Sequence, residues 1–231
     1  MAAEVARAAE AAGTTPLIVD LNAIAPATAQ RIEAVVGDAG CDLVDGSISG
    51  PPPWRPGTTR IYVSGARAPE VARLGLEGVD LIVVGDRAGA ASAVKMSTAS
   101  VYKGTTAVLA QALRAADVNG VLEHVLSDLR AGAPELVEDV ERRLASAAAK
   151  SARFVGEMRE IASAQSDAGL TPALFEAMAK VYASVAETSA ARAQPEDIPG
   201  DLSLGDVLDA LGTTERPRPA AGRPRPSRGT T

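Results

Sequence analysis

Residues 79–100, VDLIVVGDRAGAASAVKMSTAS, decide the fold, because the chain changes its character within them. The run VDLIVVG at 79–85 is short, apolar and ended by glycine, which is typical of a buried strand. From residue 88 to about residue 116 the chain is rich in alanine and free of proline, which predicts one long helix. The sequence therefore predicts an α/β unit before this point and a helical unit after it.

The first unit, residues 1–87, alternates short apolar runs with helical segments, as an α/β layer does. We expect strands at residues 16–22, 42–45, 59–64 and 79–85. We expect helices at residues 1–12, from Pro26 onward and at residues 69–76. Pro26 suits the first position of a helix, because the N–H group it lacks has no partner there.

The second unit, residues 88–195, is predicted to be an all-helical domain. Beyond the long helix, further helices are expected at residues 121–130, 134–149, 150–167 and 172–188, separated by glycine and proline. In the terminal region, residues 196–212, Ser203 and Asp206 have the spacing of a capping box, which predicts a short helix at residues 203–211. Residues 213–231 have no apolar content to bury, so we expect a disordered tail.

Composition and charge exclude several classes of function. The 231 residues are 46% hydrophobic but only 3% aromatic, which favours closely packed helices over a β-sandwich or barrel. The net charge of −6 argues against bulk attraction to nucleic acid or to an anionic membrane, and no apolar run approaches the length of about 18 residues that a membrane span needs. The single Cys41 fits a reducing cytoplasm, and a lone cysteine with the lone His124 argues against a metal site.

Lys95 is the first candidate for chemistry. It lies among small and apolar residues of the long predicted helix, on a face that also carries Ala99, Tyr102, Lys103 and Thr106. Partial burial would lower the pKa of this lysine toward the range that is useful for proton transfer. The alternative is a lysine whose stem covers the alanine-rich face while its ammonium group reaches water. The residues alone leave both interpretations open.

A second candidate is the stretch at residues 44–65, VDGSISGPPPWRPGTTRIYVSG. Ser49 and Gly50 follow the expected strand at its carboxyl end, where open α/β sheets bind ligands. Gly50 allows a close backbone approach and Ser49 offers a hydroxyl group, while Pro51 and the two prolines after it stiffen the chain. The stretch is either the wall of a binding site or a rigid, hairpin-like loop.

Three blocks in this order resemble the β-hydroxyacid dehydrogenase superfamily, which includes 3-hydroxyisobutyrate and 6-phosphogluconate dehydrogenases. They are DLNAIAPATA at 20–29, DGSISGPPPWRPGTTRIYVSG at 45–65 and GAASAVKMSTAS at 89–100. KM at 95–96, YKGTTA at 102–107 and RFVGEMREIA at 153–162 resemble the branch with a 6-phosphogluconate-dehydrogenase-like C-terminal domain of unknown function. The resemblance covers about residues 15–190. It implies a remnant of a Rossmann-like dinucleotide-binding domain, followed by an all-α domain.

The resemblance implies roles for residues on the substrate side. Lys95 corresponds to the catalytic lysine, which serves as general acid and base on the substrate. Ser49 and Gly50 correspond to the first two residues of a Ser-Gly-Gly substrate block, and Pro51 replaces its third residue. Ala99 stands where the family has a substrate-binding asparagine, four residues after the lysine.

On the cofactor side, the resemblance implies that Asn22 and Ala23 lie near the nicotinamide ring of NAD or NADP. It also implies that Lys150 lies near the cofactor. The family's Gly-x-Gly-x-x-Gly turn, which binds the pyrophosphate, does not occur in these 231 residues. We therefore expect the first part of the dinucleotide domain to be missing from the chain.

Two functions follow from these observations. The first is an NAD(P)-dependent oxidoreductase of the β-hydroxyacid dehydrogenase type, acting on a small hydroxyacid or related substrate and incomplete as given. The alternative is a non-catalytic helical module for dimerisation or interaction. The resemblance implies a homodimer joined through the helical domain, with a small-molecule substrate. The composition predicts a cytoplasmic protein with no nucleic acid, membrane or metal ion as a partner.

Overall fold

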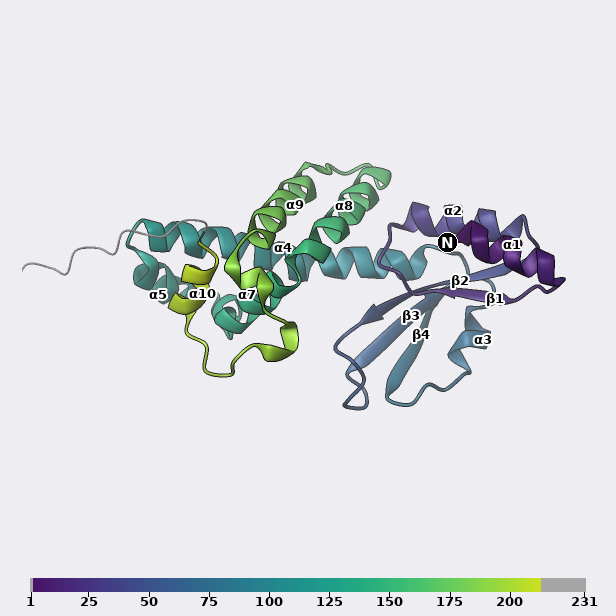
Figure 1. Cartoon of the computed structure of the whole chain (residues 1–231), viewed down its shortest axis with the longest axis horizontal. Helices are drawn as coiled ribbons and strands as arrows, with labels where there is room; N and C mark the ends of the chain where they lie inside the picture. The colour runs from purple at the N-terminus through teal and green to yellow at the C-terminus, as the bar shows by residue number, and fades with distance from the viewer. Residues whose placement is uncertain (1, 213–231) are drawn as a thin grey trace, which may run out of the picture.

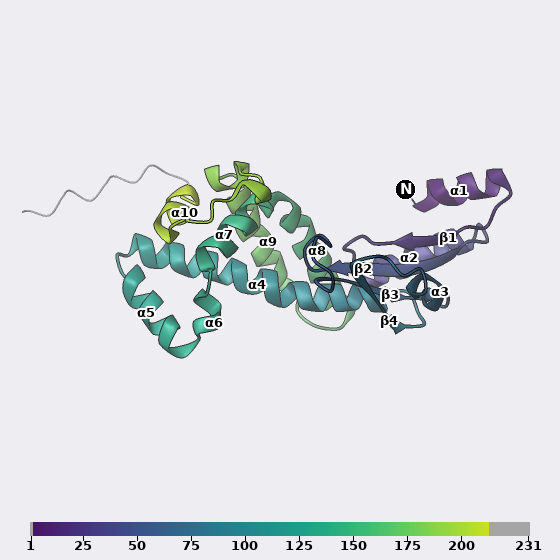
Figure 2. The ribbon, with the colours of Figure 1, turned by 90° about the horizontal axis from the view of Figure 1, so that it is seen from below.

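The structure, a computed structural model, describes residues 2–212 of the chain. A four-stranded sheet lies at one end of the molecule, and helices make up the other end (Figure 1). The long helix α4, Ala90–Val118, begins beside the sheet and runs into the helical half (Figure 2). The expected fold class, a Rossmann-like α/β remnant followed by a largely helical domain, is confirmed.

The sheet contains its strands in the order β1–β2–β3–β4. They are β1 Leu17–Asp20, β2 Asp42–Ser49, β3 Thr59–Ser64 and β4 Val79–Gly85. β2 runs parallel to β1 and antiparallel to β3, and β4 runs parallel to β3. The sheet is mixed because β2 and β3 are joined by a hairpin, whereas parallel strands need a longer crossover.

Helices cover the two faces of the sheet unequally. On one face, α1 (Ala2–Ala12) and α2 (Pro26–Gly37) pack with the strands through a small core. This core contains Ala9, Val36, Cys41, Leu43 and Ala88, with Ile18 and Ile32 packed against it. On the other face, the short helix α3 (Ala68–Ala72) packs against strand residues that include Val44 and Ile61.

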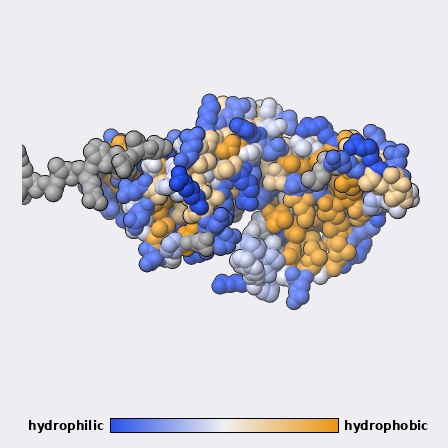
Figure 3. Space-filling view, viewed as in Figure 1, coloured by the Kyte–Doolittle hydropathy of each residue, from blue (hydrophilic) through white to orange (hydrophobic). Residues whose placement is uncertain are grey.

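Part of that second face, here called the open face, is exposed. The strand register places Val19, Ile48 and Val83 on it, and their exposed fractions lie between 38% and 43%. Figure 3 shows hydrophobic residues gathered over this part of the molecule. β1 is an edge strand, so one side of its backbone has no strand neighbour among residues 2–212. The sheet thus presents an apolar face beside an unpaired edge.

A buried carboxyl group joins the sheet to the start of α4. Asp45 on β2 is 1% exposed, and its Oδ2 atom accepts hydrogen bonds from the backbone N–H groups of Gly89 at 2.9 Å and Ser92 at 3.0 Å. The Ser92 hydroxyl donates to Oδ1 at 2.7 Å, and the Ser64 hydroxyl donates to Oδ2 at 3.1 Å. Because N–H groups in the first turn of a helix have no partner within the helix, Asp45 provides the cap that α4 lacks locally.

Two cores hold the helical half together. Its elements are α5 Leu122–Gly132, α6 Pro134–Val137, α7 Val140–Ala149, α8 Ser151–Asp167, α9 Ala173–Ala186, the 3₁₀ helices Ser189–Arg192 and Pro195–Asp197, and α10 Leu204–Ala210. One core lies where α4, α8 and α9 meet and includes Met158 and Tyr182. The other joins α4 to α5, α7 and α10 and includes Leu113. As the sequence predicted, Ser203 caps α10, because its hydroxyl accepts from the Asp206 N–H at 3.2 Å.

Two element boundaries differ clearly from those expected. β2 continues to Ser49 instead of ending at residue 45, because its second half pairs with β3 in the hairpin. The helix expected at residues 134–149 is broken between α6 and α7, where Asp139 takes a positive φ of 49°. Neither glycine nor proline marks this break in the sequence, so pattern alone could not locate it.

Three further expectations concern the boundary between the two units, the C-terminal tail and membrane-spanning helices. The boundary expected at residues 87–88 falls between the last residue of β4, Gly85, and the first residue of α4, Ala90. The tail expected to be disordered, residues 213–231, lies outside the described residues. Within residues 2–212, no helix combines the length and the apolar character that crossing a membrane requires.

Asp45→Ala should lower the free energy of unfolding by about 3 kcal/mol, because it leaves two buried N–H groups without an acceptor. Urea unfolding followed by circular dichroism measures this change. Asp42→Ala, on the same strand, is the matched control. Its carboxylate pairs with Arg67 at 3.0 Å on the surface, so its removal should barely move the unfolding midpoint. Equal shifts for the two variants would contradict the anchoring role of Asp45.

Candidate functional site

A pocket opens where the sheet half and the helical half meet. Its volume is about 390 Å³, and its wall combines the end of β1, the β2–β3 hairpin, α4 and α8. It is lined by Leu21, Asn22, Ala23, Ser47, Ile48, Gly50, Lys95, Lys103, Arg153 and Glu157. Four residues predicted from the sequence therefore meet in one place: Asn22, Ala23, Gly50 and Lys95.

Lys95, in the second turn of α4, reaches the end of β2. Its Nζ atom donates a hydrogen bond to the backbone carbonyl oxygen of Ile48 at 2.7 Å. Burial lowers the pKa of Lys95 below its ordinary value, and the positive charge of Arg153 lowers that pKa further. A lysine with a lowered pKa releases its proton more readily near neutral pH, as general acid–base catalysis requires.

Asn22 and Ala23 lie just beyond the last residue of β1. The Asn22 backbone N–H and the Asn22 Nδ2 atom both donate to Oδ1 of Asp20, at 2.8 and 2.5 Å. This local turn fixes the backbone as it leaves the strand. Ala23 packs against the core between α4, α8 and α9. The sheet side of the pocket therefore presents the Asn22 amide group beside small residues and the apolar side chains of Leu21 and Ile48.

The hairpin at the edge of the pocket depends on Gly50. Its φ of 108° disfavours other residues, and a Cβ atom there would lie 2.2 Å from the backbone oxygen of Thr58. Ser49, expected beyond the strand, is instead the last residue of β2. Neither Ser49 nor Pro51 is among the described residues that line the pocket, and the Pro51 carbonyl oxygen accepts a hydrogen bond from the Thr59 hydroxyl. The stretch is thus a hairpin whose Gly50 borders the pocket.

Two other residues singled out from the sequence do not line the pocket. Ala99 is 5% exposed and belongs to the core between α4, α8 and α9, so a small apolar side chain fills the position of the family's asparagine. Lys150 follows the last residue of α7 and donates from Nζ to the Ser146 hydroxyl at 3.0 Å. Its charge still acts on the pocket, because it contributes to lowering the pKa of Lys103.

Three charged residues without a role in the sequence-based prediction complete the pocket. The Lys103 ammonium group on α4 forms an ion pair with Oε2 of Glu157 on α8, and Arg153 Nε lies 3.2 Å from Oε1 of the same carboxylate. The side chains of Lys103 and Glu157 are 16% and 13% exposed, whereas that of Arg153 is 69% exposed. The Lys103 Nζ atom also lies 4.6 Å from the centre of the Phe154 ring, whose face attracts a cation. We call Lys103, Glu157 and Arg153 the charged cluster.

Burial dominates the electrostatics of the charged cluster. Burial, followed by the positive charges of Lys95, Arg153 and Lys150, lowers the pKa of Lys103 to about 7. The Glu157 carboxylate acts in the opposite direction, because it favours the charged form of the lysine. Lys103 is therefore able to exchange a proton near neutral pH.

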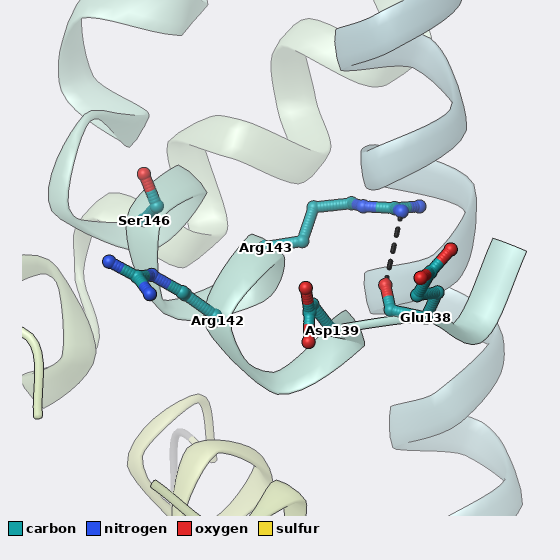
Figure 4. A pocket seen from close by; sticks show the side chains of 5 residues that line it. All are labelled: Glu138, Asp139, Arg142, Arg143 and Ser146. Carbon is teal, nitrogen blue, oxygen red and sulfur yellow. Dashed lines mark hydrogen bonds between the residues drawn. The ribbon is translucent and has the colours of Figure 1, made fainter. Parts of the chain in front are cut away.

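A second depression, of about 350 Å³, lies at the start of α7 (Figure 4). It is lined by Glu138, Asp139, Arg142, Arg143 and Ser146. The Arg143 guanidinium group donates to three backbone carbonyl oxygens around the end of α6, at 3.1 to 3.3 Å, and Figure 4 marks the bond to Glu138. Because the last carbonyls of a helix have no partner within it, this arginine stabilises the break between α6 and α7. Arg143 therefore has a structural role at this depression.

The pocket includes only some of the positions that the family resemblance implies for a dinucleotide cofactor. Asn22 and Ala23, the positions implied for the nicotinamide ring, share its wall with Lys95. The Gly-x-Gly-x-x-Gly turn that would hold the pyrophosphate is not found in the 231 residues. Residues 2–212 contain no group of three or more histidine, cysteine, aspartate or glutamate side chains placed to hold a metal ion.

Known proteins resemble this chain in both halves. Residues 116–185 match the family described as "Domain of unknown function (DUF1932)". A conserved hypothetical protein from Sinorhizobium meliloti 1021 has a similar structure, with a TM-score of 0.69 and 27% identity, over 90% of this chain and 71% of that one. The conserved protein MTH1747 of unknown function, described as structurally similar to 3-hydroxyacid dehydrogenases, gives a TM-score of 0.66 and 28% identity, over 80% of this chain and 71% of that one.

A 3-hydroxyisobutyrate dehydrogenase from Mycobacterium tuberculosis, determined with L-serine, shares the fold. Its TM-score is 0.59 at 20% identity, over 90% of this chain and 76% of that one. No curated protein matched the sequence. The comparisons confirm the resemblance to 3-hydroxyacid dehydrogenase-like proteins that the sequence predicted.

Arg153→Leu should raise the pKa of Lys103 above about 7, because it removes a neighbouring positive charge and leaves Glu157 to pair with Lys103 alone. NMR titration of the lysine side-chain resonances measures this pKa. Arg159→Leu is the matched control, since Arg159 is an exposed arginine of the same helix that does not line the pocket. A Lys103 pKa that stays unchanged in Arg153→Leu would rule out the electrostatic coupling.

Proposed function

We propose that this chain supplies the substrate pocket and the proton-transfer residue of an NAD(P)-dependent oxidoreductase of the β-hydroxyacid dehydrogenase type. Its substrate is a small hydroxyacid or a related compound. The observation that carries the proposal is the place of Lys95, which lines one pocket together with Asn22 and Ala23. The likeness to 3-hydroxyacid dehydrogenase-like proteins supports it.

Oxidation of an alcohol removes a hydride from carbon and a proton from oxygen as the carbon–oxygen double bond forms. A bound nicotinamide cofactor supplies the hydride acceptor, or the hydride donor in the reverse direction. Neutral Lys95 takes the hydroxyl proton, and its ammonium form returns the proton when the reaction runs in reverse. The hydrogen bond to the Ile48 carbonyl oxygen holds the lysine at the pocket wall, and its lowered pKa makes the neutral form more accessible.

The proposal assigns only the nicotinamide end of the cofactor to this chain. Asn22 offers an amide and Ala23 leaves space beside it, whereas binding of the pyrophosphate requires a glycine-rich turn at a helix N-terminus. Tight cofactor binding would therefore require a further segment or domain that supplies such a turn. Micromolar binding of NADH or NADPH to residues 1–231 by themselves would show that this division is wrong.

A second candidate function is favoured by the open face of the sheet. Val19, Ile48 and Val83 leave apolar surface exposed there, beside the unpaired edge of β1. Exposed apolar surface of this kind marks interaction sites, and an unpaired edge strand is a template for a further strand. In this alternative the chain is a non-catalytic module that pairs with a separately encoded dinucleotide-binding domain.

We also propose that the helical half forms a homodimer. An apolar depression runs between α4 and α9, and it is lined by Ala107, Val108, Gln111, Ala112, Ala115, Leu174, Ala177, Met178 and Val181. Val108 and Leu174 are each more than half exposed in the single chain. The alanines allow a second helix to approach closely, so a second copy of the chain would bury this surface well.

Lys95→Met and Lys95→Arg separate proton transfer from a purely electrostatic role. Methionine removes the charge, whereas arginine keeps the charge but does not release its proton. Both variants should lower kcat for oxidation of 3-hydroxypropanoate by about 10²–10⁴-fold, the usual contribution of a general acid–base group. Absorbance of the reduced nicotinamide measures turnover of the full chain with NAD or NADP.

Lys180→Met, at an exposed lysine of α9, is the control for this experiment and should react like the parent. If Lys95→Arg retains the parent kcat, Lys95 acts only through its charge. Because tight cofactor binding is not expected of residues 1–231 by themselves, the assay uses a large excess of NAD or NADP. If the parent chain shows no turnover under that condition, the non-catalytic module is favoured.

Val108→Asp and Leu174→Asp should convert the homodimer to a monomer, because each places a charge in an apolar interface. Size-exclusion chromatography with light scattering reports the mass, which is 23.5 kDa for one chain. Val118→Asp is the matched control, since Val118 is an exposed valine of α4 that does not line the depression. A parent protein that is already monomeric would refute this interface.

A further inference from the structure

The pocket contains more positive charge than proton transfer requires. Lys95, Lys103 and Arg153 line it, together with the single carboxylate of Glu157. The proposed reaction uses only Lys95, so the two cations of the charged cluster have no role in it. A recess in which positive charges outnumber negative ones attracts and retains anions.

The Glu157 carboxylate positions both cations of the cluster and uses only some of their N–H donors. One of its oxygen atoms pairs with Lys103 and the other with Arg153 Nε. An ammonium group has three N–H donors and a guanidinium group has five, so one carboxylate leaves donors on each for a further acceptor. Arginine and lysine with spare donors are the groups that recognise carboxylates and phosphates.

The position of the cluster along α4 separates it from the proton-transfer residue. Lys103 follows Lys95 by eight residues, which is a rise of about 12 Å along a helix. Both side chains nevertheless line the same pocket of about 390 Å³. The positive charge of Lys95 also lowers the pKa of Lys103, so the two ammonium groups lie within electrostatic reach of each other. One small hydroxyacid can therefore place its hydroxyl group at Lys95 and its acid group at the cluster.

We propose that Lys103 and Arg153, held by Glu157, form an oxyanion subsite that binds an acid group of the compound whose hydroxyl group reacts at Lys95. The inference rests on the proposed function and names a determinant of its substrate class. Lys103 and Arg153 are the specificity residues, because they contact the acid group. Glu157 is a positioning residue, because it acts through the two cations.

The subsite makes anion binding depend on pH. An anion favours the charged form of Lys103, whose pKa without ligand is about 7, so above that pH the lysine must take up a proton on binding. Affinity should therefore be highest below pH 7 and fall as the pH rises above 7. The charged groups that set this behaviour are Lys95, Arg153, Lys150 and Glu157.

Tyr182 of α9 also faces Lys103, because its hydroxyl donates to the Lys103 carbonyl oxygen at 2.7 Å. Burial raises the pKa of Tyr182, so the phenol remains neutral over the pH range in which Lys103 titrates. The tyrosine therefore adds no charge to the subsite.

NMR titration of the full chain with 3-hydroxypropanoate tests the subsite without any redox readout. Its uncharged counterpart, 1,3-propanediol, is the matched ligand and should bind at least about tenfold more weakly, because it lacks the carboxylate that charged hydrogen-bond donors recognise. Lys103→Met and Arg153→Leu should each weaken binding of 3-hydroxypropanoate by about tenfold, because each removes one of those charged donors. Lys180→Met should bind like the parent.

Lys103→Arg distinguishes recognition from a loss of folding. It keeps the positive charge, so it should retain affinity within about threefold while losing the decline of affinity between pH 6 and pH 8. Unchanged affinity for 3-hydroxypropanoate in both Lys103→Met and Arg153→Leu would overturn the proposal.

Inorganic pyrophosphate separates the two sources of an oxyanion. If the same substitutions weaken binding of pyrophosphate and leave that of 3-hydroxypropanoate unchanged, the subsite stands but receives a cofactor phosphate, and its assignment to the substrate is wrong. The proposed function fails separately, through normal turnover in Lys95→Arg. Hydroxyacid binding at the cluster and proton transfer at Lys95 are therefore tested independently.

Discussion

The contact between the Asp45 carboxyl group and the first turn of α4 is the constraint on which the pocket depends. It fixes where α4 leaves the sheet, and α4 carries both Lys95 and Lys103. The cap comes from β2 and not from the residue before the helix. The backbone N–H groups at the start of α4 therefore have their acceptor only when the sheet is formed. A second carboxylate, Glu160 of α8, accepts a hydrogen bond from the Ala25 N–H at 2.8 Å, just before α2. The two halves are thus joined by hydrogen bonds to carboxylates that each half supplies.

Within the pocket so formed, burial and the neighbouring positive charges both favour the neutral forms of the two lysines. Burial is the largest cause of the lowered pKa of Lys95 and of Lys103, and the remaining causes are neighbouring cations. Arg153 is mostly exposed, and its positive charge lowers the pKa of both lysines. Glu157 offsets part of this repulsion by pairing with Arg153 and Lys103. The result is an arginine beside two lysines whose lowered pKa values make their charge sensitive to what the pocket holds.

The sequence predicted those parts of the structure that depend on local patterns. The change from VDLIVVG to an alanine-rich run predicted where the sheet ends and where the long helix begins. The order of the motifs assigned Asn22, Gly50 and Lys95 to one site, and these three residues line one pocket. The cap by Asp45 was missed because its partners are more than 40 residues away along the chain. The cluster was missed for the same reason: the four-residue spacing of Arg153 and Glu157 is a common surface pattern, and nothing local shows that α8 lies against α4.

The two proposed surfaces of the chain do not compete, because they lie on different halves. The apolar depression of α4 and α9 belongs to the helical half, and the open face belongs to the sheet. Leu21 connects that face to the pocket: a Cβ atom at Gly46 would lie 2.5 Å from its Cδ2 atom, and Leu21 itself lines the pocket. Since Leu21 is 39% exposed, a partner that covers the open face beside it also touches the pocket wall. A contact that buries the apolar face would therefore also close one side of the site at Lys95.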